Sequence, residues 1–408
     1  MDQLLDWWRR GLVAALGLSI AFLGIGGLEF FGAGASVSAW SISRTTFFFW
    51  LLWKLLLLYH RGWRQTELNR LKILAPLWLF FSVVTLSLLP DFHQAGDYRY
   101  FFFGCAHAVM VFDVFPAAPQ RRRLAMLMGL LPIILVLRGV LHNPAILNFS
   151  LAQRLAYPLD HANTAGYLLA MTLPLCVVVA AATSGWWRRF SWVSCVTQMS
   201  GLVLTFSRGA WLGSFASIIY LTITLKRWKL LAIFLLVPAV CTVVFPALEN
   251  RFVSVTHPSD DPAIRERLQR LTSAVQLGLD HPILGVGYGR GRLKEWLPSY
   301  FKGTILEGAP VLHTHNVYVE LFAETGAIGL MVFLWLIGQT LGRLWCSSLA
   351  RAGAERLFGF GLAAAWIAAI FTGVGDVPFY HHETRIYFFT LFALAHLYYA
   401  DHGVETVP

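Results

Sequence analysis

The stretch Val311–Leu330, VLHTHNVYVELFAETGAIGL, passes within a few residues from polar to apolar sequence. It begins with His313, His315 and Asn316 and continues as a glycine-spaced apolar run of the kind found in membrane helices. Polar side chains with acid–base chemistry are thus placed where water would give way to lipid. The rest of the sequence shows whether this boundary belongs to a membrane protein.

Composition indicates an all-α polytopic membrane protein. Of the 408 residues, 57% are hydrophobic and only 13% are charged, too little charge to cover the surface of a soluble domain of this length. The first apolar run, Gly11–Phe31, is too long for the core of a signal peptide and long enough to span a bilayer, so we expect an uncleaved first helix. Helices are expected throughout because their backbone groups are satisfied within one segment.

Twelve apolar segments have about the length of a membrane span. We predict a single integral membrane domain over residues 1–408 with about twelve transmembrane helices, near 11–31, 39–59, 74–90, 99–118, 124–141, 164–184, 190–206, 209–225, 230–247, 316–341, 356–373 and 385–400.

The basic residues give the predicted orientation. They gather at the N-terminus and in every second short loop, namely Arg9, Arg10, Arg61, Arg64, Arg70, Lys72, Arg121–Arg123, Arg188, Arg189, Lys226, Arg227, Lys229, Arg343, Arg351 and Arg356. Basic loops remain cytoplasmic, so both termini are expected there, and a large loop over 248–315, between the ninth and tenth helices, is expected outside. This distribution accounts for the net charge of +10 without a nucleic-acid partner.

A polar stretch, Thr205–Gly213 (TFSRGAWLG), separates the seventh and eighth apolar runs. It predicts a tight external turn with Arg208 near membrane depth. Such an arginine either snorkels to the interface or faces a cavity or partner, and we favour the second because ionisable groups at this depth are costly.

The external loop is predicted to contain an amphipathic helix. Asp261-Pro262 is a helix start, and Ile264, Leu268, Leu271, Val275 and Leu279 follow at helical spacing. Three arginines of this helix, Arg265, Arg267 and Arg270, are either a solvated basic face or phosphate ligands, and Arg267 lies at the edge of the apolar stripe. The run HPILGVGYG then alternates Gly285, Gly287 and Gly289, which permits close approach of a ligand.

Polar residues near helix ends on the same side are candidate site residues. His315 has the properties of a general base, although, taken alone, it is better explained as a helix-capping or interface histidine. Asp160, Asn163 and Asp376 are expected to support the site. Two histidines two residues apart with distant carboxylates do not make a metal site, and the five cysteines show no metal spacing, so no metal and no cofactor is predicted.

Together, SRGAW, an arginine fourteen residues before HPILGVGYG, and HNVYVELFAETGAIGL resemble the signature of the O-antigen ligase and polymerase superfamily. The motifs extend over roughly Leu159–Leu330. The resemblance implies a GT-C-like, membrane-embedded glycosyltransferase with an active site on the periplasmic side of the bacterial inner membrane. It implies transfer of a polysaccharide from undecaprenyl diphosphate to a sugar hydroxyl of lipid A–core, without metal and with inversion of configuration.

The resemblance also implies residue roles. Arg208 and Arg267 match its diphosphate-binding arginines, and His315 matches its general base. Arg265 lies beside Arg267 and His313 beside His315, so either member of each pair can hold the main role. We expect further substrate-binding contributions from Ser207, Arg270, Asn163, Asp160, Asp376 and Asn316, and we expect membrane lipids as partners.

Two alternatives stay open at this stage. The same chemistry with another acceptor would make the chain an O-antigen repeat polymerase or a protein O-glycosyltransferase. A different class, a transporter or flippase for a lipid-linked anion, would use the arginines to line a passage.

Overall fold

The computed structural model describes residues 1–25, 28–29, 36–37, 39–62, 72–88, 97–148, 150, 152–159, 161–244, 262–311 and 313–403. Its elements, in chain order, are α1 (Asp2–Ile25), β1 (Leu28–Glu29), β2 (Ser36–Val37), α2 (Ala39–Arg61), α4 (Ala75–Ser87), α5 (Tyr98–Val114), α6 (Ala118–Leu130), α7 (Pro132–His142), η2 (Pro144–Asn148), α8 (Ala162–Ala182), α9 (Gly185–Leu204), α10 (Arg208–Leu225), α11 (Trp228–Val244), α13 (Pro262–Asp280), α14 (Arg290–Trp296), η3 (Leu297–Phe301), α15 (Val317–Leu349), α16 (Gly353–Gly375), η4 (Pro378–Tyr380) and α17 (His382–Gly403).

The prediction of an all-α protein is confirmed, and the apolar helices are consistent with a membrane protein. Apart from one antiparallel pair, in which Leu28 lies opposite Val37, the regular elements of the described residues are helices. Each predicted apolar segment coincides with a helix, or with the pair α6 and α7. Five helices among the described residues are long and apolar enough to cross a membrane: Ser41–Arg61, Ala118–His142, Ala162–Ala182, Val317–Leu349 and Gly353–Gly375.

The number of twelve spans stays a prediction, for a reason that α4 illustrates. This helix has 13 residues. At a rise of about 1.5 Å per residue it is roughly 20 Å long, whereas a bilayer core is about 30 Å thick. Several of the predicted segments are therefore helical without meeting the length of a full span within the described residues.

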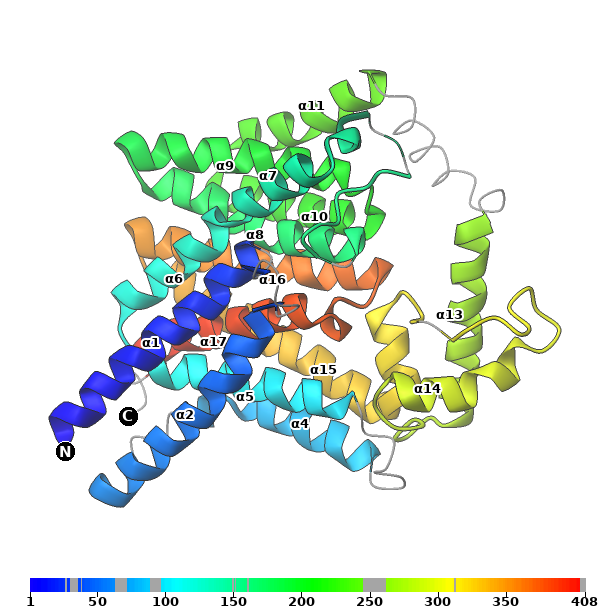
Figure 1. Ribbon diagram of the computed structural model, residues 1–408, viewed down its shortest axis with the longest axis horizontal. Helices are drawn as coiled ribbons and strands as arrows, with labels where there is room; N and C mark the ends of the chain where they lie inside the picture. The colour runs from blue at the N-terminus through cyan, green and yellow to red at the C-terminus, as the bar shows by residue number, and fades with distance from the viewer. Residues whose placement is uncertain are drawn as a thin grey trace.

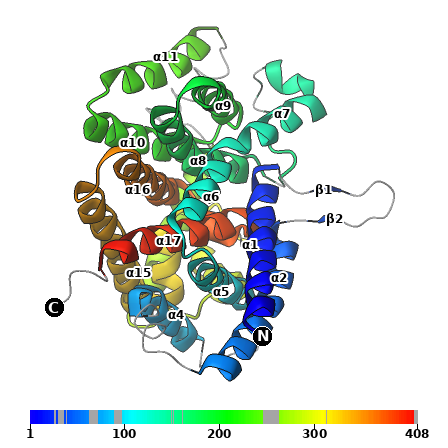
Figure 2. The ribbon, with the colours of Figure 1, turned by 90° about the vertical axis from the view of Figure 1, so that its left-hand side faces the viewer.

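The bundle is built around α8. Its residues are buried on every side, from Thr164 to Ala180, and α6, α9, α10 and α16 pack around it (Figure 2). An apolar helix that is buried all round belongs to the interior of a large bundle. Because α8 begins at Ala162, its first two turns carry Asn163 and Tyr167 toward the interior of the protein.

The contact between α10 and α16 is unusually close. A Cβ on Gly213 would come within 2.1 Å of Thr372 Oγ1 and 2.5 Å of the Ala368 carbonyl oxygen. A Cβ on Gly375 would lie 2.9 Å from the Cα of Gly209. Small residues at such contacts let membrane helices approach backbone to backbone. The first residue of α10, Arg208, is thereby brought beside the end of α16.

The described part of the long loop forms a unit with its own hydrophobic core. α13, α14 and η3 enclose apolar side chains that include Ala274, Leu277, Leu293 and Phe301. This unit lies at the end of the bundle opposite the N-terminus of α1 (Figure 1). The N-terminus of α1 and the loop unit thus lie at opposite ends of the bundle, and the predicted orientation in the membrane stays a prediction.

The glycine run after α13 docks on a break in α15. Gly326 has φ 66° and ψ −169°, a conformation open only to glycine, and it interrupts the helix. The loop backbone satisfies the freed groups: Val286 N–H donates to the Ala323 carbonyl at 3.0 Å, and Ala327 N–H donates to the Pro282 carbonyl at 2.7 Å. At Gly285 a Cβ would lie 2.4 Å from the Glu324 carbonyl carbon. The sequence indicates that these glycines permit close approach of a ligand. In the structure it is the backbone of α15 that approaches them.

Candidate active site

A very short connection joins α9 to α10. α9 ends at Leu204 and α10 begins at Arg208. Phe206 adopts a left-handed conformation with φ 51°, and the Ser207 N–H donates to Thr205 Oγ1 at 3.3 Å. The tight turn predicted from the sequence is present, and it places Arg208 in the first turn of a helix whose N-terminal end carries partial positive charge.

His315 lies in a similar left-handed conformation, with φ 59°, which is uncommon for a residue other than glycine. The next residue, Asn316, caps α15: its Oδ1 accepts two backbone N–H groups of the first turn, at 3.0 and 3.1 Å. Asn316 Nδ2 also donates to the Val374 carbonyl at 3.1 Å, which ties the start of α15 to the end of α16. This geometry turns the His315 ring toward Asp376, with Nδ1 3.0 Å from Asp376 Oδ1.

The contact with Asp376 defines the chemistry of the His315 ring. An ionised carboxylate can only accept hydrogen bonds, so Nδ1 is the protonated nitrogen and donates. In the neutral ring Nε2 then holds the lone pair, and it points away from Asp376. A histidine fixed by a carboxylate through one nitrogen presents the other as a base.

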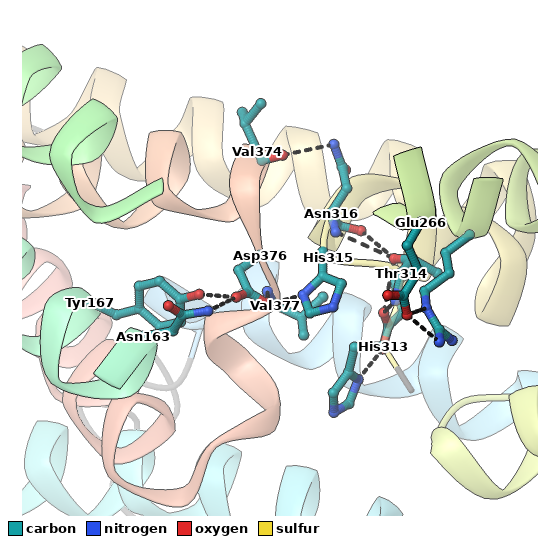
Figure 3. A network of polar contacts seen from close by, with 12 residues as sticks. Asn163, Tyr167, Glu266, His313, Thr314, His315, Asn316, Val374, Asp376 and Val377 are labelled. Carbon is teal, nitrogen blue, oxygen red and sulfur yellow. Dashed lines mark hydrogen bonds and ion pairs between the residues drawn. The ribbon is translucent and has the colours of Figure 1, made fainter. Parts of the chain in front are cut away.

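Asp376 is held by partners from several helices. Its Oδ2 accepts from Asn163 Nδ2 at 2.8 Å and from the Tyr167 hydroxyl, and its Oδ1 also accepts from the Val377 N–H at 2.9 Å. Figure 3 shows Asp376 between Tyr167 and Asn163 on one side and His315 on the other. The carboxylate is only 4% exposed.

The charge state of Asp376 follows from this environment. Burial by itself would raise the pKa of the carboxyl, but the hydrogen bond and charge of His315, the Tyr167 hydroxyl and the charge of Arg267 outweigh burial. The pKa of Asp376 is therefore held well below its usual range. Asp376 remains an ionised acceptor that orients His315.

Two adjoining cavities meet at this site. The larger, of about 880 Å³, is lined mainly by apolar side chains of α9, α10, α11 and α13, and its polar lining includes Arg208, Arg267 and His315. The smaller is polar, with a volume of about 20 Å³, and its lining includes Arg208, Arg267, Ser207, Asn163 and Asp376. His315 thus borders the large apolar cavity, and its partner Asp376 borders the small polar one.

The three arginines of α13 are placed differently. Arg267 shares a helical face with Ile264, Leu268 and Leu271, and this face lines the large cavity. Arg265 is exposed and lines neither cavity. Of these two arginines, between which the sequence left the choice open, Arg267 is thus the one that borders the cavities.

Arg270 faces the interior of the loop unit and does not line either cavity. It is only 2% exposed. Its guanidinium donates to Glu266 Oε1 at 2.7 and 3.1 Å and to the Pro310 carbonyl at 3.0 Å. These contacts place Arg270 in the framework of the loop, and the substrate-binding role predicted for it stays a prediction.

His313 and His315 belong to separate groups. His313 Nδ1 lies 2.6 Å from Oε1 of Glu320, whose side chain is fully buried. Glu320 Oε2 accepts from the Thr314 N–H at 2.7 Å and from Thr314 Oγ1 at 2.9 Å. Figure 3 shows His313 directed away from Asp376. The geometry therefore distinguishes His315, which faces the cavity, from His313, which pairs with Glu320.

Some members of the site were not predicted. Tyr167 and Glu320 lie inside apolar helices, and Arg154 lies in a connecting segment outside the motifs that the sequence shows. Arg154 donates from Nη2 to Asn163 Oδ1 at 2.7 Å and from Nε to the Thr205 carbonyl at 2.7 Å. A polar side chain one helical turn inside an apolar run was the available signal for Tyr167 and Glu320. Asp160 lies outside the described residues.

The carboxylates and histidines of the site do not form a metal-binding cluster. Within the described ranges, no group of three or more His, Cys, Asp or Glu side chains is arranged to hold a metal ion.

Comparison with known proteins assigns the central part of the chain to a family. Residues 193–334, from α9 to α15, match the family model described as O-Antigen ligase. The matched segment contains Arg208, Arg267 and His315 but ends before Asp376. A search of the curated proteins gave no match. Over residues 193–334 the chain is therefore similar to the O-antigen ligase family.

Proposed function

We propose that the protein is an O-antigen ligase. It transfers a glycan from undecaprenyl diphosphate to a sugar hydroxyl of lipid A–core, at the periplasmic leaflet of the bacterial inner membrane. The observation that carries this proposal is the placement of the His315–Asp376 pair beside Arg208 and Arg267 at the polar end of one apolar cavity of about 880 Å³.

The lining of the cavity fits a lipid-linked anion. Its walls are formed by apolar side chains, and Leu212, Phe215, Leu235 and Leu268 of this lining are exposed in the isolated chain, by 37% to 49%. A long isoprenoid chain would cover this surface and gain the free energy of removing it from water. The two guanidinium groups would then face the diphosphate, whose oxygens match their planar fork of donors.

The reaction is a displacement at the anomeric carbon of the donor sugar. The acceptor oxygen forms the new C–O bond while the bond between the anomeric carbon and the diphosphate oxygen breaks, so the configuration inverts. His315 Nε2 takes the proton of the acceptor hydroxyl, and Asp376 stabilises the imidazolium that results. A positioned base of this kind contributes on the order of 10²–10⁴-fold to the rate.

The leaving group carries away the electron pair of the broken bond. Undecaprenyl diphosphate gains negative charge as it departs, and Arg208 and Arg267 lie where they would neutralise it. Fixed donors aimed at developing charge often supply the largest part of catalysis. This arrangement needs no protonated carboxyl to assist departure, and Asp376, being ionised, does not supply one.

A transfer assay with purified protein tests the proposal. The donor is an undecaprenyl diphosphate-linked glycan, and it is offered separately with lipid A–core, with a second lipid-linked glycan and with an acceptor protein. Glycosylated lipid A–core is the expected product. Elongation of the second lipid-linked glycan, or transfer to the protein alone, would show a polymerase or a protein O-glycosyltransferase instead.

The same assay separates catalysis from transport. Wild-type protein and the variant His315→Ala are compared for product formation and for donor binding. We expect the variant to bind donor normally and to form almost no product. If no acceptor is ever glycosylated but the donor crosses proteoliposome membranes, the protein is a transporter and the ligase proposal fails. Addition of EDTA should leave the wild-type rate unchanged, and a metal-restored loss would contradict the arginine-based mechanism.

A further inference from the structure

Arg208 and Arg267, which lie in the family motifs, border the small polar cavity of the candidate site. A third arginine borders this cavity as well. Arg154 belongs to the segment between η2 and α8, outside the residues that match the family model. Together with Arg208 and Arg267 it gives this cavity lining three guanidinium groups, against the single carboxylate of Asp376. The three arginines come from three separate parts of the chain.

The position of Arg154 is fixed by two hydrogen bonds. Its Nε donates to the Thr205 carbonyl at 2.7 Å, and its Nη2 donates to Asn163 Oδ1 at 2.7 Å. Thr205 begins the tight turn that leads into Arg208, so the two arginines are held on either side of one turn. A guanidinium bound at two points is pre-organised, which lowers the entropic cost of binding an anion.

The second hydrogen bond links Arg154 to the base. Asn163 accepts from Arg154 through Oδ1 and donates through Nδ2 to Asp376 Oδ2, at 2.8 Å. Asp376 in turn accepts from His315. Arg154 is therefore connected through one amide and one carboxylate to the ring that faces the large cavity.

We propose that Arg154 is a third cation of the anion site and binds the diphosphate of a lipid-linked donor together with Arg208 and Arg267. This inference rests on the proposed function. In a glycosyl diphosphate each phosphate carries a negative charge, and the leaving group gains another when the glycosidic bond breaks. A lining with three guanidinium groups matches a diphosphate better than a monophosphate, and Arg154 supplies the preference for the second phosphate.

The experiment compares two ligands with the same lipid chain. Undecaprenyl diphosphate and undecaprenyl monophosphate are titrated into the full-length protein in nanodiscs, and the ratio of the two Kd values measures recognition of the second phosphate. We expect Arg154→Ala to lower the preference for the diphosphate by roughly 10- to 100-fold, the range typical of a lost hydrogen bond to a charged group. Binding of the monophosphate should change much less.

Two further variants separate charge from support of the turn. Arg154→Lys keeps the positive charge, whereas Arg154→Gln keeps a donor for the Thr205 carbonyl without the charge. Recovery of the diphosphate preference by Lys and not by Gln supports the proposal. Equal recovery by Lys and Gln, or an unchanged preference in Arg154→Ala, overturns it and leaves Arg154 as a support of the turn.

Arg138 provides the matched control. It lies close by, donates from Nη2 to the Tyr157 hydroxyl at 3.1 Å, is also partly buried, and borders neither cavity. Arg138→Ala should therefore leave the ratio unchanged. Failure of the proposed function has a different signature: the wild-type protein would then not glycosylate lipid A–core in the transfer assay, whatever the ratio of the two Kd values.

Discussion

The Nδ1 atom of His315 lies 3.0 Å from Oδ1 of Asp376, although the two residues are 61 positions apart in the chain. One residue precedes α15 and the other follows α16, and the cap residue Asn316 ties the two helix ends together. The base and the group that orients it thus belong to different helices, and their contact depends on how these helices pack.

The first prediction concerns this pair. His315→Ala should lower kcat/KM for glycan transfer on the order of 10²–10⁴-fold, because the positioned base is removed. Asp376→Ala should cause a large loss, since the ring would lose its fixed tautomer and orientation, and Asp376→Asn should be milder because one acceptor oxygen remains. Steady-state kinetics with the defined donor and acceptor measures both effects. Wild-type rates in His315→Ala would remove its catalytic role.

The second prediction distinguishes two neighbouring arginines. Arg267→Ala should raise the Kd for undecaprenyl diphosphate by roughly 10- to 100-fold, because Arg267 lines both cavities. Arg265→Ala is the matched control on the same helix, and it should leave the Kd within about twofold, since its exposed side chain has the screened environment of a surface charge. The reverse order would mean that α13 is rotated when the donor is bound.

The third prediction concerns Glu320, whose carboxylate accepts three hydrogen bonds from His313 and Thr314. Glu320→Ala leaves the buried Thr314 N–H without its partner, and the segment that carries His315 should lose its fixed conformation. We expect kcat to fall by roughly 10- to 100-fold, an effect of about 1.4–3 kcal/mol on the barrier, with little change in donor Kd.

Two substitutions at the same position serve as controls. Glu320→Gln can still accept from Thr314 and can donate to His313, so it should retain most activity. Glu320→Asp keeps the charge, but its side chain is one methylene shorter and no longer reaches His313 and Thr314. It should therefore behave like Glu320→Ala. If Asp restores activity and Gln does not, the charge of Glu320 matters rather than its hydrogen bonds.

The fourth prediction tests the packing of α10 on α16. Gly213→Ala would place a methyl group 2.1 Å from Thr372 Oγ1 and 2.5 Å from a backbone carbonyl oxygen, so the helices must separate. We expect a loss of about 1–3 kcal/mol in the free energy of unfolding, together with lower activity because Arg208 moves relative to Asp376. Thermal denaturation in detergent and the transfer assay measure the two effects.

Gly338 of α15 is the control for this packing. A Cβ there meets nothing within 4 Å, so Gly338→Ala should be neutral or should stabilise the protein by up to about 1 kcal/mol through helix propensity. Equal destabilisation by the two substitutions would show that the loss comes from alanine in these helices generally and not from the α10–α16 contact.

The fifth prediction concerns pH and His381, which lies between η4 and α17. Burial lowers the pKa of His381 to about 4; Asp376 acts to raise it, and His313, His161 and Arg385 act to lower it further. The unfolded chain, with a pKa of about 6.5 for histidine, binds the proton more readily than the folded protein. Stability is therefore lost as the pH falls from about 6.5 toward 4.

The variant His381→Gln cannot take up this proton. We expect the difference in Tm between His381→Gln and wild type to shift in favour of the variant when the pH is lowered from about 7 to 5. Measurement of both proteins at both pH values cancels the contributions of the other histidines. A difference independent of pH would show that His381 is not neutral in the folded protein.

The sequence by itself determined the helices and the motifs that carry Arg208, Arg267 and His315. Apolar runs, helix starts such as Asp261-Pro262 and polar breaks such as the one before Arg208 are local patterns, and the backbone responds to them locally. Arg208, Arg267 and His315 were found because each lies in a short motif. The position of Arg267 at the edge of an apolar stripe was also visible, since it needs only the period of one helix.

The tertiary structure alone decided which residues meet. The close packing of α10 on α16 brings Arg208 to Asp376, and the cap at Asn316 turns His315 toward the same carboxylate. The loop glycines contact the break at Gly326 because the backbone groups of the loop and of α15 bond to each other. Arg270 turns into the loop because its guanidinium finds a partner there in the Pro310 carbonyl. Arg154 joins the site through Thr205 and Asn163, 51 and 9 residues away. Such contacts depend on long-range packing, which no periodicity within one segment encodes.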